Sequence, residues 1–113
     1  MADEVKVPDW AKQVGFGIIV CDTEGTIVYM NDTAIAAKKG DLTGTNIFGC
    51  HSPKSLEIIR SLLTEGGCHA YTVEKEGKKK IIYQCPWREN GEIRGLCEII
   101  AEFTGDLPHV VRK

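Results

Sequence analysis

The last third of the chain carries only strand signals, and this limits the folds that the chain can adopt. Residues 68–75, 80–87 and 93–103 each alternate apolar and polar side chains, as strands with one buried face do. Glu76-Gly77 separates the first two runs, and residues 89–92 separate the last two with an Asn-Gly hairpin signal. The sequence therefore predicts three consecutive antiparallel strands at the C-terminal end of the domain.

A second hairpin is predicted near the N-terminus. Residues 16–21 form an apolar run of strand length, and residues 26–30 form a second one. Asp22-Thr23-Glu24-Gly25 lies between them and has the composition of a tight turn. Before this hairpin, the spacing of the apolar residues in 7–14 fits a short, weakly amphipathic helix.

The middle of the chain has helical signals. Asn31 and its polar neighbours are suited to cap a short helix over residues 34–37, and residues 42–49 predict a short helical turn. Ser52 is placed to cap a longer helix, because Pro53 follows at the first helical position. Gly66-Gly67 ends that helix.

These elements predict an α+β domain with the order β-β-α-α-α-β-β-β. We expect a five-stranded antiparallel sheet with the helices over one face. Residues 15–104 form the domain, residues 1–14 a leader that takes part in dimerisation, and residues 105–113 a tail. With 113 residues the chain is long enough for one core and one small pocket.

The pocket is expected between the helices and the sheet. On the last three strands we expect the odd-numbered apolar residues to face the helices. The expected lining is Ile35, Ile47, Leu56, Ile59, Leu63, Tyr71, Tyr83, Cys85, Cys97 and Ile99.

The opposite, outer face of the sheet is then expected to mix apolar and charged side chains. Glu98 and Glu102 share this face, and we interpret them as exposed carboxylates. A mixed apolar face left open to water suggests a cover, either Trp10 and Val14 of the leader or a second copy of the chain, and we favour the second copy. The expected dimer interface is Trp10, Val14, Ile82, Leu96 and Ile100.

Composition narrows the class of protein. The formal net charge is −2, so no overall field attracts nucleic acid, and Lys78-Lys79-Lys80 is interpreted as a solvated hairpin end. The N-terminus lacks the pattern of a signal peptide, and no apolar run reaches the roughly 20 residues that span a bilayer. Five cysteines, an odd number, suggest reduced thiols. We therefore expect a cytoplasmic protein that contacts neither membrane nor nucleic acid.

No recognisable catalytic motif is present. The chain lacks a Gly-x-Ser-x-Gly nucleophile, a phosphate-binding loop and dinucleotide-binding glycine spacing. Cys50-His51 and Cys68-His69 suggest a zinc site, but the helix of about 12 residues predicted between them separates the pairs by roughly 18 Å. We therefore predict neither an enzyme nor a metal site.

Three segments together resemble the PAS family. Residues 17–31 look like the opening PAS hairpin, with Asp-x-x-Gly, Ile-Val-Tyr and then Asn. Leu42-Thr43-Gly44 resembles the family's Leu-x-Gly segment before its long helix. Pro86 followed by residues 89–95 is similar to its second hairpin. The resemblance covers roughly residues 15 to 103, and residues 50–55 and 107–112 also resemble a subgroup of bacterial stand-alone PAS proteins.

The resemblance implies sensing and signal transduction, with a small molecule held between helices and sheet and signalling through protein contacts, often in a homodimer. Haem is an alternative cofactor, with His51 or His69 as the candidate ligand, although the helix over residues 52–65 lacks the histidine that haem-binding PAS domains usually carry there. Flavin is disfavoured, since residues 46–50 only loosely resemble the light sensors' cysteine motif. A thiol redox role for Cys50 is a further alternative.

Overall fold

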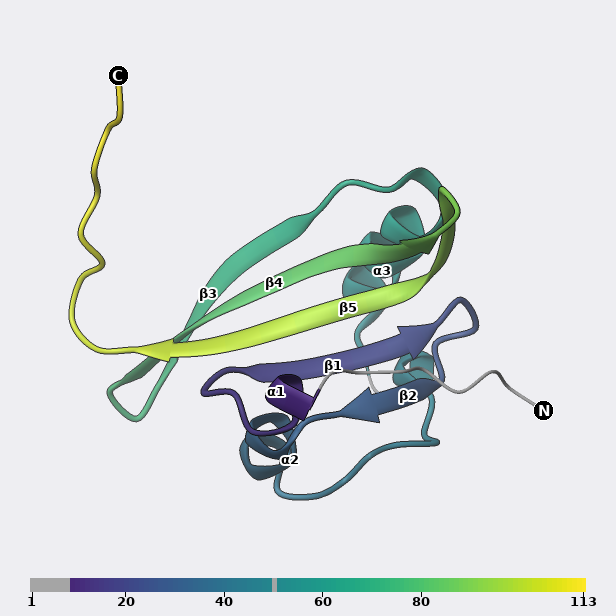
Figure 1. Ribbon diagram of the computed structural model, residues 1–113, viewed down its shortest axis with the longest axis horizontal. Coiled ribbons are helices and arrows are strands. Elements are labelled where there is room, and N and C mark those ends of the chain that lie inside the picture. The colour runs from purple at the N-terminus through teal and green to yellow at the C-terminus, as the bar shows by residue number, and fades with distance from the viewer. Residues whose placement is uncertain (1–8, 50) are drawn as a thin grey trace.

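The structure, a computed structural model that describes residues 9–49 and 51–113, contains a five-stranded antiparallel sheet (Figure 1). The strand order is β2-β1-β5-β4-β3, so the two terminal strands of the domain, β1 and β5, are neighbours at its centre. The strands are β1 (Gly17–Asp22), β2 (Ile27–Met30), β3 (His69–Lys75), β4 (Lys78–Glu89) and β5 (Glu92–Phe103). The predicted α+β class and order of elements are confirmed.

Helices lie on both faces of this sheet. We call one the helix face, because α2 (Asp32–Lys38) and α3 (Pro53–Glu65) cover it, with the short 3₁₀ helix η1 (Ile47–Gly49) between them in the chain. The other, which we call the outer face, is partly covered by α1 (Asp9–Lys12), whose Ala11 packs on Ile18 and Val20. Among the described residues, no helix is both long and apolar enough to cross a membrane.

The helix ends follow the predicted capping signals. The Asn31 side chain accepts the backbone N–H of Ala34 and caps α2, and Ser52 accepts that of Ser55 and caps α3 with Pro53 at its first turn. Gly66 ends α3 with a positive φ of 87°. Both polar caps therefore fix where the covering helices begin.

The segment before η1 differs from its prediction. Instead of a helical turn over residues 42–49, residues 44–47 run beside β2: Gly44 donates to the Ile27 carbonyl, Ile27 to that of Thr45, and Ile47 to that of Gly25. These bonds pair part of the free edge of β2, which the sequence pattern does not reveal. They also place Ile47 over the helix face.

The predicted facing of β4 and β5 is wrong. Leu96 and Ile100 are 4% and 6% exposed and pack under α3 and α2, and Ile82 lies in the same core. The residues expected to face the helices lie on the outer face instead, in register with Ile18 and Val20 of β1. These are Tyr83, Cys85, Cys97 and Ile99.

The error has a physical cause. Both strands carry apolar residues on both faces, as in the adjacent pairs Ile81-Ile82 and Ile99-Ile100, so period-2 alternation does not distinguish the faces. The prediction relied on Glu98 as a marker of the solvent side. In the structure Glu98 is half-buried on the helix face, where the Gln84 amide donates to it over 2.7 Å.

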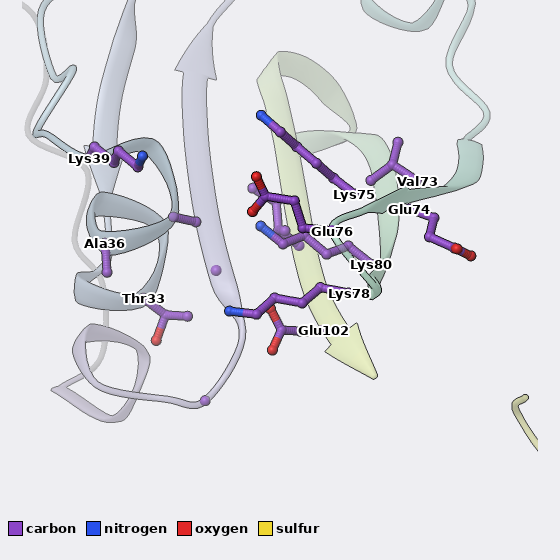
Figure 2. A pocket seen from close by; sticks show the side chains of 14 residues that line it. Thr33, Ala36, Lys39, Val73, Glu74, Lys75, Glu76, Lys78, Lys80 and Glu102 are labelled. Carbon is purple, nitrogen blue, oxygen red and sulfur yellow. The ribbon is translucent and has the colours of Figure 1, made fainter. Parts of the chain in front are cut away.

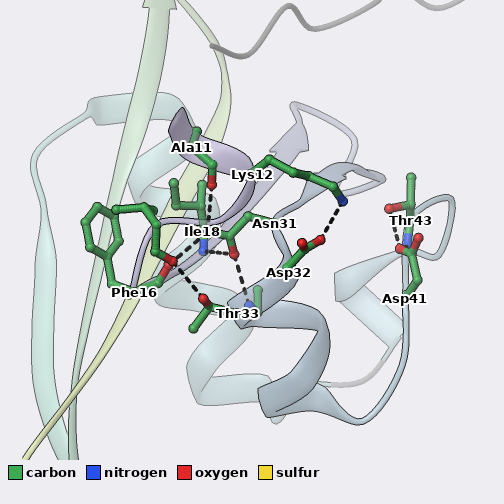
Figure 3. A network of polar contacts seen from close by, with 11 residues as sticks. Ala11, Lys12, Phe16, Ile18, Asn31, Asp32, Thr33, Asp41 and Thr43 are labelled. Carbon is green, nitrogen blue, oxygen red and sulfur yellow. Dashed lines mark hydrogen bonds and ion pairs between the residues drawn. The ribbon is translucent and has the colours of Figure 1, made fainter. Parts of the chain in front are cut away.

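Asn31 connects α1 and α2, which lie on opposite faces, to the sheet, as Figure 3 shows. It is fully buried, and its Oδ1 accepts the backbone N–H of Ile18 in β1 at 2.9 Å and that of Ala34 in α2 at 3.0 Å. Its Nδ2 donates to the carbonyls of Ala11 and Phe16 at 3.0 and 2.8 Å. One side chain therefore satisfies four backbone groups from α1, β1 and α2.

We predict that Asn31→Ala lowers the free energy of unfolding by about 3 kcal/mol, because it leaves these buried backbone groups without partners. Asn46→Ala is the matched control. Its amide also makes two backbone hydrogen bonds, but at an exposed position, and its loss should cost about 1 kcal/mol or less. Urea unfolding with an unchanged m-value measures both. Equal costs for the two variants would contradict the role given to Asn31.

Candidate functional site

A pocket of about 350 Å³ lies between the helix face of the sheet and the segments that cover it. This is within the range of small-molecule sites. Its wall is mainly aliphatic, with contributions from β1, β2, η1, α3 and the three C-terminal strands. The lining residues are Ile19, Cys21, Ile27, Lys38, Leu42, Ile47, His51, Ile59, Tyr71, Ile82, Gln84, Leu96 and Glu98.

A row of polar side chains crosses the sheet at this pocket. The registers place His69 opposite Gln84, and Gln84 opposite Glu98. Gln84 is 5% exposed, and its Nε2 donates to Glu98 Oε1 at 2.7 Å. Its Oε1 therefore faces His69, whose Nδ1 donates to it over 3.3 Å. The row presents a carboxylate in an otherwise largely apolar wall.

A second hollow of about 300 Å³ adjoins the first and shares Ile59, Tyr71 and Gln84 with it. His51 also lines both, and its Nδ1 lies 2.7 Å from the Ile47 carbonyl oxygen. The His69 and Tyr71 rings are in contact, with centroids 5.1 Å apart. Together these side chains form a partly polar rim between α3 and β3.

The structure brings some predicted pocket residues together and separates others. Ile47, Ile59 and Tyr71 line the pocket, whereas Ile35 and Leu63 pack in the adjoining core, and Leu56 is half-buried on α3 outside the lining. Of the redox and haem candidates, His51 lines the pocket, His69 lines the adjoining hollow, and Cys50 lies outside the described residues.

The four residues on the outer face, Tyr83, Cys85, Cys97 and Ile99, do not reach the pocket. Of the predicted dimer residues, Ile82, Leu96 and Ile100 are buried under the helices and cannot contact a second chain. Trp10 is 64% exposed on α1, and Val14 packs against the outer-face core.

Sequence reasoning missed Gln84 and Glu98, the hydrogen-bonded pair of polar residues in the pocket, and also Lys38 of α2. A signal for Glu98 is present: it is the one charged residue in the run Leu96-Cys97-Glu98-Ile99-Ile100. A carboxylate flanked by apolar residues on both faces is typical of a functional position as well as of a solvent face. Cys21, which also lines the pocket, behaves as a small apolar residue, since burial raises the pKa of its thiol to about 11.

A larger hollow, about 760 Å³, lies elsewhere, between α2 and the turn joining β3 to β4 (Figure 2). Its rim carries four lysines and three glutamates, nearly all exposed, so neither sign of charge dominates. They are Lys39, Lys75, Lys78, Lys80, Glu74, Glu76 and Glu102. The smaller pocket has only Lys38 and Glu98 as charged lysine or carboxylate side chains in its lining and is otherwise mainly aliphatic, as small-molecule sites are, so we place the candidate site there. In residues 9–49 and 51–113, no three His, Cys, Asp or Glu side chains are grouped to hold a metal ion.

No protein-family model matches the chain, and neither does any curated protein. Solved structures do match. The sensor region of a sensor histidine kinase is 21% identical with a TM-score of 0.62, and the match covers 76% of this chain and 38% of that one. The chain thus spans well under half of that protein's length.

Two further matches cover most of both chains. The PAS domain of an HTR-like protein from Haloarcula marismortui is 18% identical with a TM-score of 0.57, covering 83% of this chain and 86% of that one. The Aer2 receptor from Vibrio cholerae, described as a dual PAS-haem oxygen sensor, is 18% identical with a TM-score of 0.55, covering 79% and 95%. The chain has the PAS fold.

Proposed function

We propose that this domain is a sensory module that binds a small molecule in the helix-face pocket and signals through protein contacts. The single observation that carries the proposal is the Glu98–Gln84 pair, which lies in a largely apolar pocket between covering segments and sheet. Polar groups of this kind orient a ligand and provide specificity, while the apolar wall provides affinity. The PAS sensor domains of similar fold support the same assignment.

The lining also suggests the chemistry of the ligand. Glu98 Oε1 is already bonded to Gln84, and the carboxylate has further acceptor capacity beside aliphatic side chains such as Ile19 and Ile82. A ligand with a compact apolar body and one N–H donor or cationic nitrogen matches this wall. The volume of about 350 Å³ favours a molecule of roughly one or two rings.

The residues present fit haem less well than they fit this class of small ligand. A haem macrocycle is wide, flat and apolar, and its iron needs an axial histidine over the ring. Here the Gln84 amide and the Glu98 carboxylate lie on the pocket wall, and His69 is engaged with Gln84. The alternative thiol function of Cys50 remains a prediction from the sequence.

The ligand class is tested with Glu98→Gln. This variant keeps the side-chain shape and removes the charge, so we expect small heterocyclic amines to bind at least about 10-fold more weakly, whereas their uncharged carbon analogues should be unaffected. Thermal-shift screening finds the binders and calorimetry measures their Kd. Native mass spectrometry of freshly purified protein reports any molecule that co-purifies.

Glu102→Gln is the matched control, because Glu102 follows on the same strand and face but lines the larger hollow. It should change Kd less than about 2-fold. Equal losses in the two variants would argue against a ligand at Glu98. Failure of any small molecule to raise the melting temperature would argue against the sensory proposal itself.

We also propose that two copies associate through the outer face. From β3 to β5 this face exposes apolar side chains without a covering helix: Tyr83 is 40% exposed, and Ile81 and Ile99 are half-buried beside it. The outer-face positions between Ile81 and Cys85 of β4, and their partners on β5, carry no charge, and Lys79 lies at the end of this stretch. An uncharged stretch of this kind suits a self-complementary homodimer contact. Trp10 on α1 is a second exposed aromatic residue of the chain.

Tyr83→Glu tests the dimer, because a charge in an apolar contact should weaken self-association at least about 10-fold. Val73→Glu is the control: Val73 is 42% exposed, close to the 40% of Tyr83, but lies on the opposite face of the sheet. Analytical ultracentrifugation gives the dimer Kd for each. A monomeric parent chain, or equal weakening by both variants, would overturn the proposal that this surface forms the dimer contact.

A further inference from the structure

Three cysteines lie in one row across the outer face. Cys85 of β4 is directly opposite Cys97 of β5. On its other side, the register of β3 places His69 opposite Gln84, so Cys68, the residue before His69, falls opposite Cys85. Neither the pocket nor the proposed ligand uses these thiols.

The two neighbouring pairs differ in geometry. The turn between β3 and β4 has two residues with positive φ, Glu76 at 54° and Gly77 at 79°, as in a type I′ hairpin. The residues that flank such a turn, Lys75 and Lys78, form a hydrogen-bonded pair. Pairs alternate from there without a register shift, so His69–Gln84 is hydrogen-bonded and the next position, Cys68–Cys85, is not.

Continued by one residue beyond His69, this register brings Cys68 and Cys85 to the closer type of cross-strand position. A disulfide requires Cβ atoms about 3.5–4.5 Å apart, and opposite Cβ atoms come closer to this distance at non-hydrogen-bonded positions than at hydrogen-bonded ones. In β4–β5, counting from the Asn90-Gly91 turn through the shift at Trp87 makes Cys85–Cys97 the wider, hydrogen-bonded type. The backbone therefore favours a bond between Cys68 and Cys85.

The surroundings of the two thiols differ, and this decides which of them reacts first. Cys68 is exposed, whereas Cys85 is half-buried. The Cys68 thiol also interacts with the Tyr83 hydroxyl, which raises the pKa of Tyr83. Burial, and after it the charge of Cys68, raises the pKa of Cys85. In the single chain, a reagent from solution therefore meets Cys68 first, and Cys85 lies beside it to react second.

We propose that Cys68 and Cys85 form a dithiol site that is oxidised by low-molecular-weight disulfides. The Cys68 thiolate attacks a disulfide R–S–S–R, forms Cys68–S–S–R and releases R–S⁻. Cys85 then attacks the Cys68 sulfur, releases the second R–S⁻ and loses its proton to a released thiolate. Two protein thiols are oxidised to one disulfide, and one small disulfide is reduced to two thiols.

The bond would lie next to the end of α3, a helix that lines the pocket. Cys68 follows Gly66-Gly67, which ends α3, and α3 supplies Ile59 to the pocket. The disulfide would join the C-terminal end of this helix to β4 and close the loop that contains β3. Oxidation of the outer face would thereby restrain one wall of the pocket on the helix face.

The test uses the full chain and oxidised glutathione. After incubation, free thiols are blocked and the protein is digested with trypsin without reduction. Cys68 falls in peptide 61–75, Cys85 in 81–88 and Cys97 in 95–112, so each possible bond gives a distinct linked pair. We expect 61–75 linked to 81–88, a yield independent of protein concentration, and a higher melting temperature for the oxidised chain.

Three variants separate the steps. Cys85→Ser should stop at a glutathionyl adduct on Cys68, and Cys68→Ser should give neither adduct nor bond at Cys85. Cys97→Ser, the matched control, should form the Cys68–Cys85 bond as the parent chain does. A dominant 81–88 to 95–112 link, a bond only between chains, or a stable adduct on Cys68 in the parent chain would each overturn the proposal.

Discussion

The fold depends on one buried amide. Asn31 follows β2 and caps α2, and its four hydrogen bonds reach α1 on one face of the sheet, β1 and the residue before it, and α2 on the other face. A buried amide with all of these bonds made specifies one arrangement, because any other would leave several backbone groups unpaired. The exposed Lys12–Asp32 ion pair at 2.8 Å joins the same two helices, but such pairs contribute little.

Much of the fold could be predicted from local signals. The Asn31 and Ser52 caps, the Asn90-Gly91 turn and the apolar runs of the first hairpin each depend on neighbouring residues, and all appear where expected. The facing of β4 and β5 could not be predicted in this way. It depends on which apolar row meets α2 and α3, and both rows of these strands are apolar enough to be buried.

Because the facing of β4 and β5 could not be predicted, part of the candidate site could not be predicted either. Ile47, Ile59 and Tyr71 could be predicted because a helix stripe or an edge strand has one plausible inner face. The sequence predicts an exposed Glu98, because polar residues usually mark the exposed side, and it gives no signal for Gln84. In a sheet with two apolar faces, a single carboxylate that is hydrogen-bonded to an amide is better explained as a polar group inside a pocket than as a mark of the solvent side.

Strand alternation also connects the two faces. Gln84 faces the pocket and lies between Tyr83 and Cys85, which face outward, and Glu98 lies between Cys97 and Ile99 in the same way. The sheet is a single layer of closely packed strands. A shift of β4 against β5 would therefore move the side chains on both faces. On the proposed function, a ligand that changes the Gln84–Glu98 pair would move the backbone that carries the outer side chains. The proposal therefore needs no element besides the sheet to connect the candidate pocket with the surface opposite it.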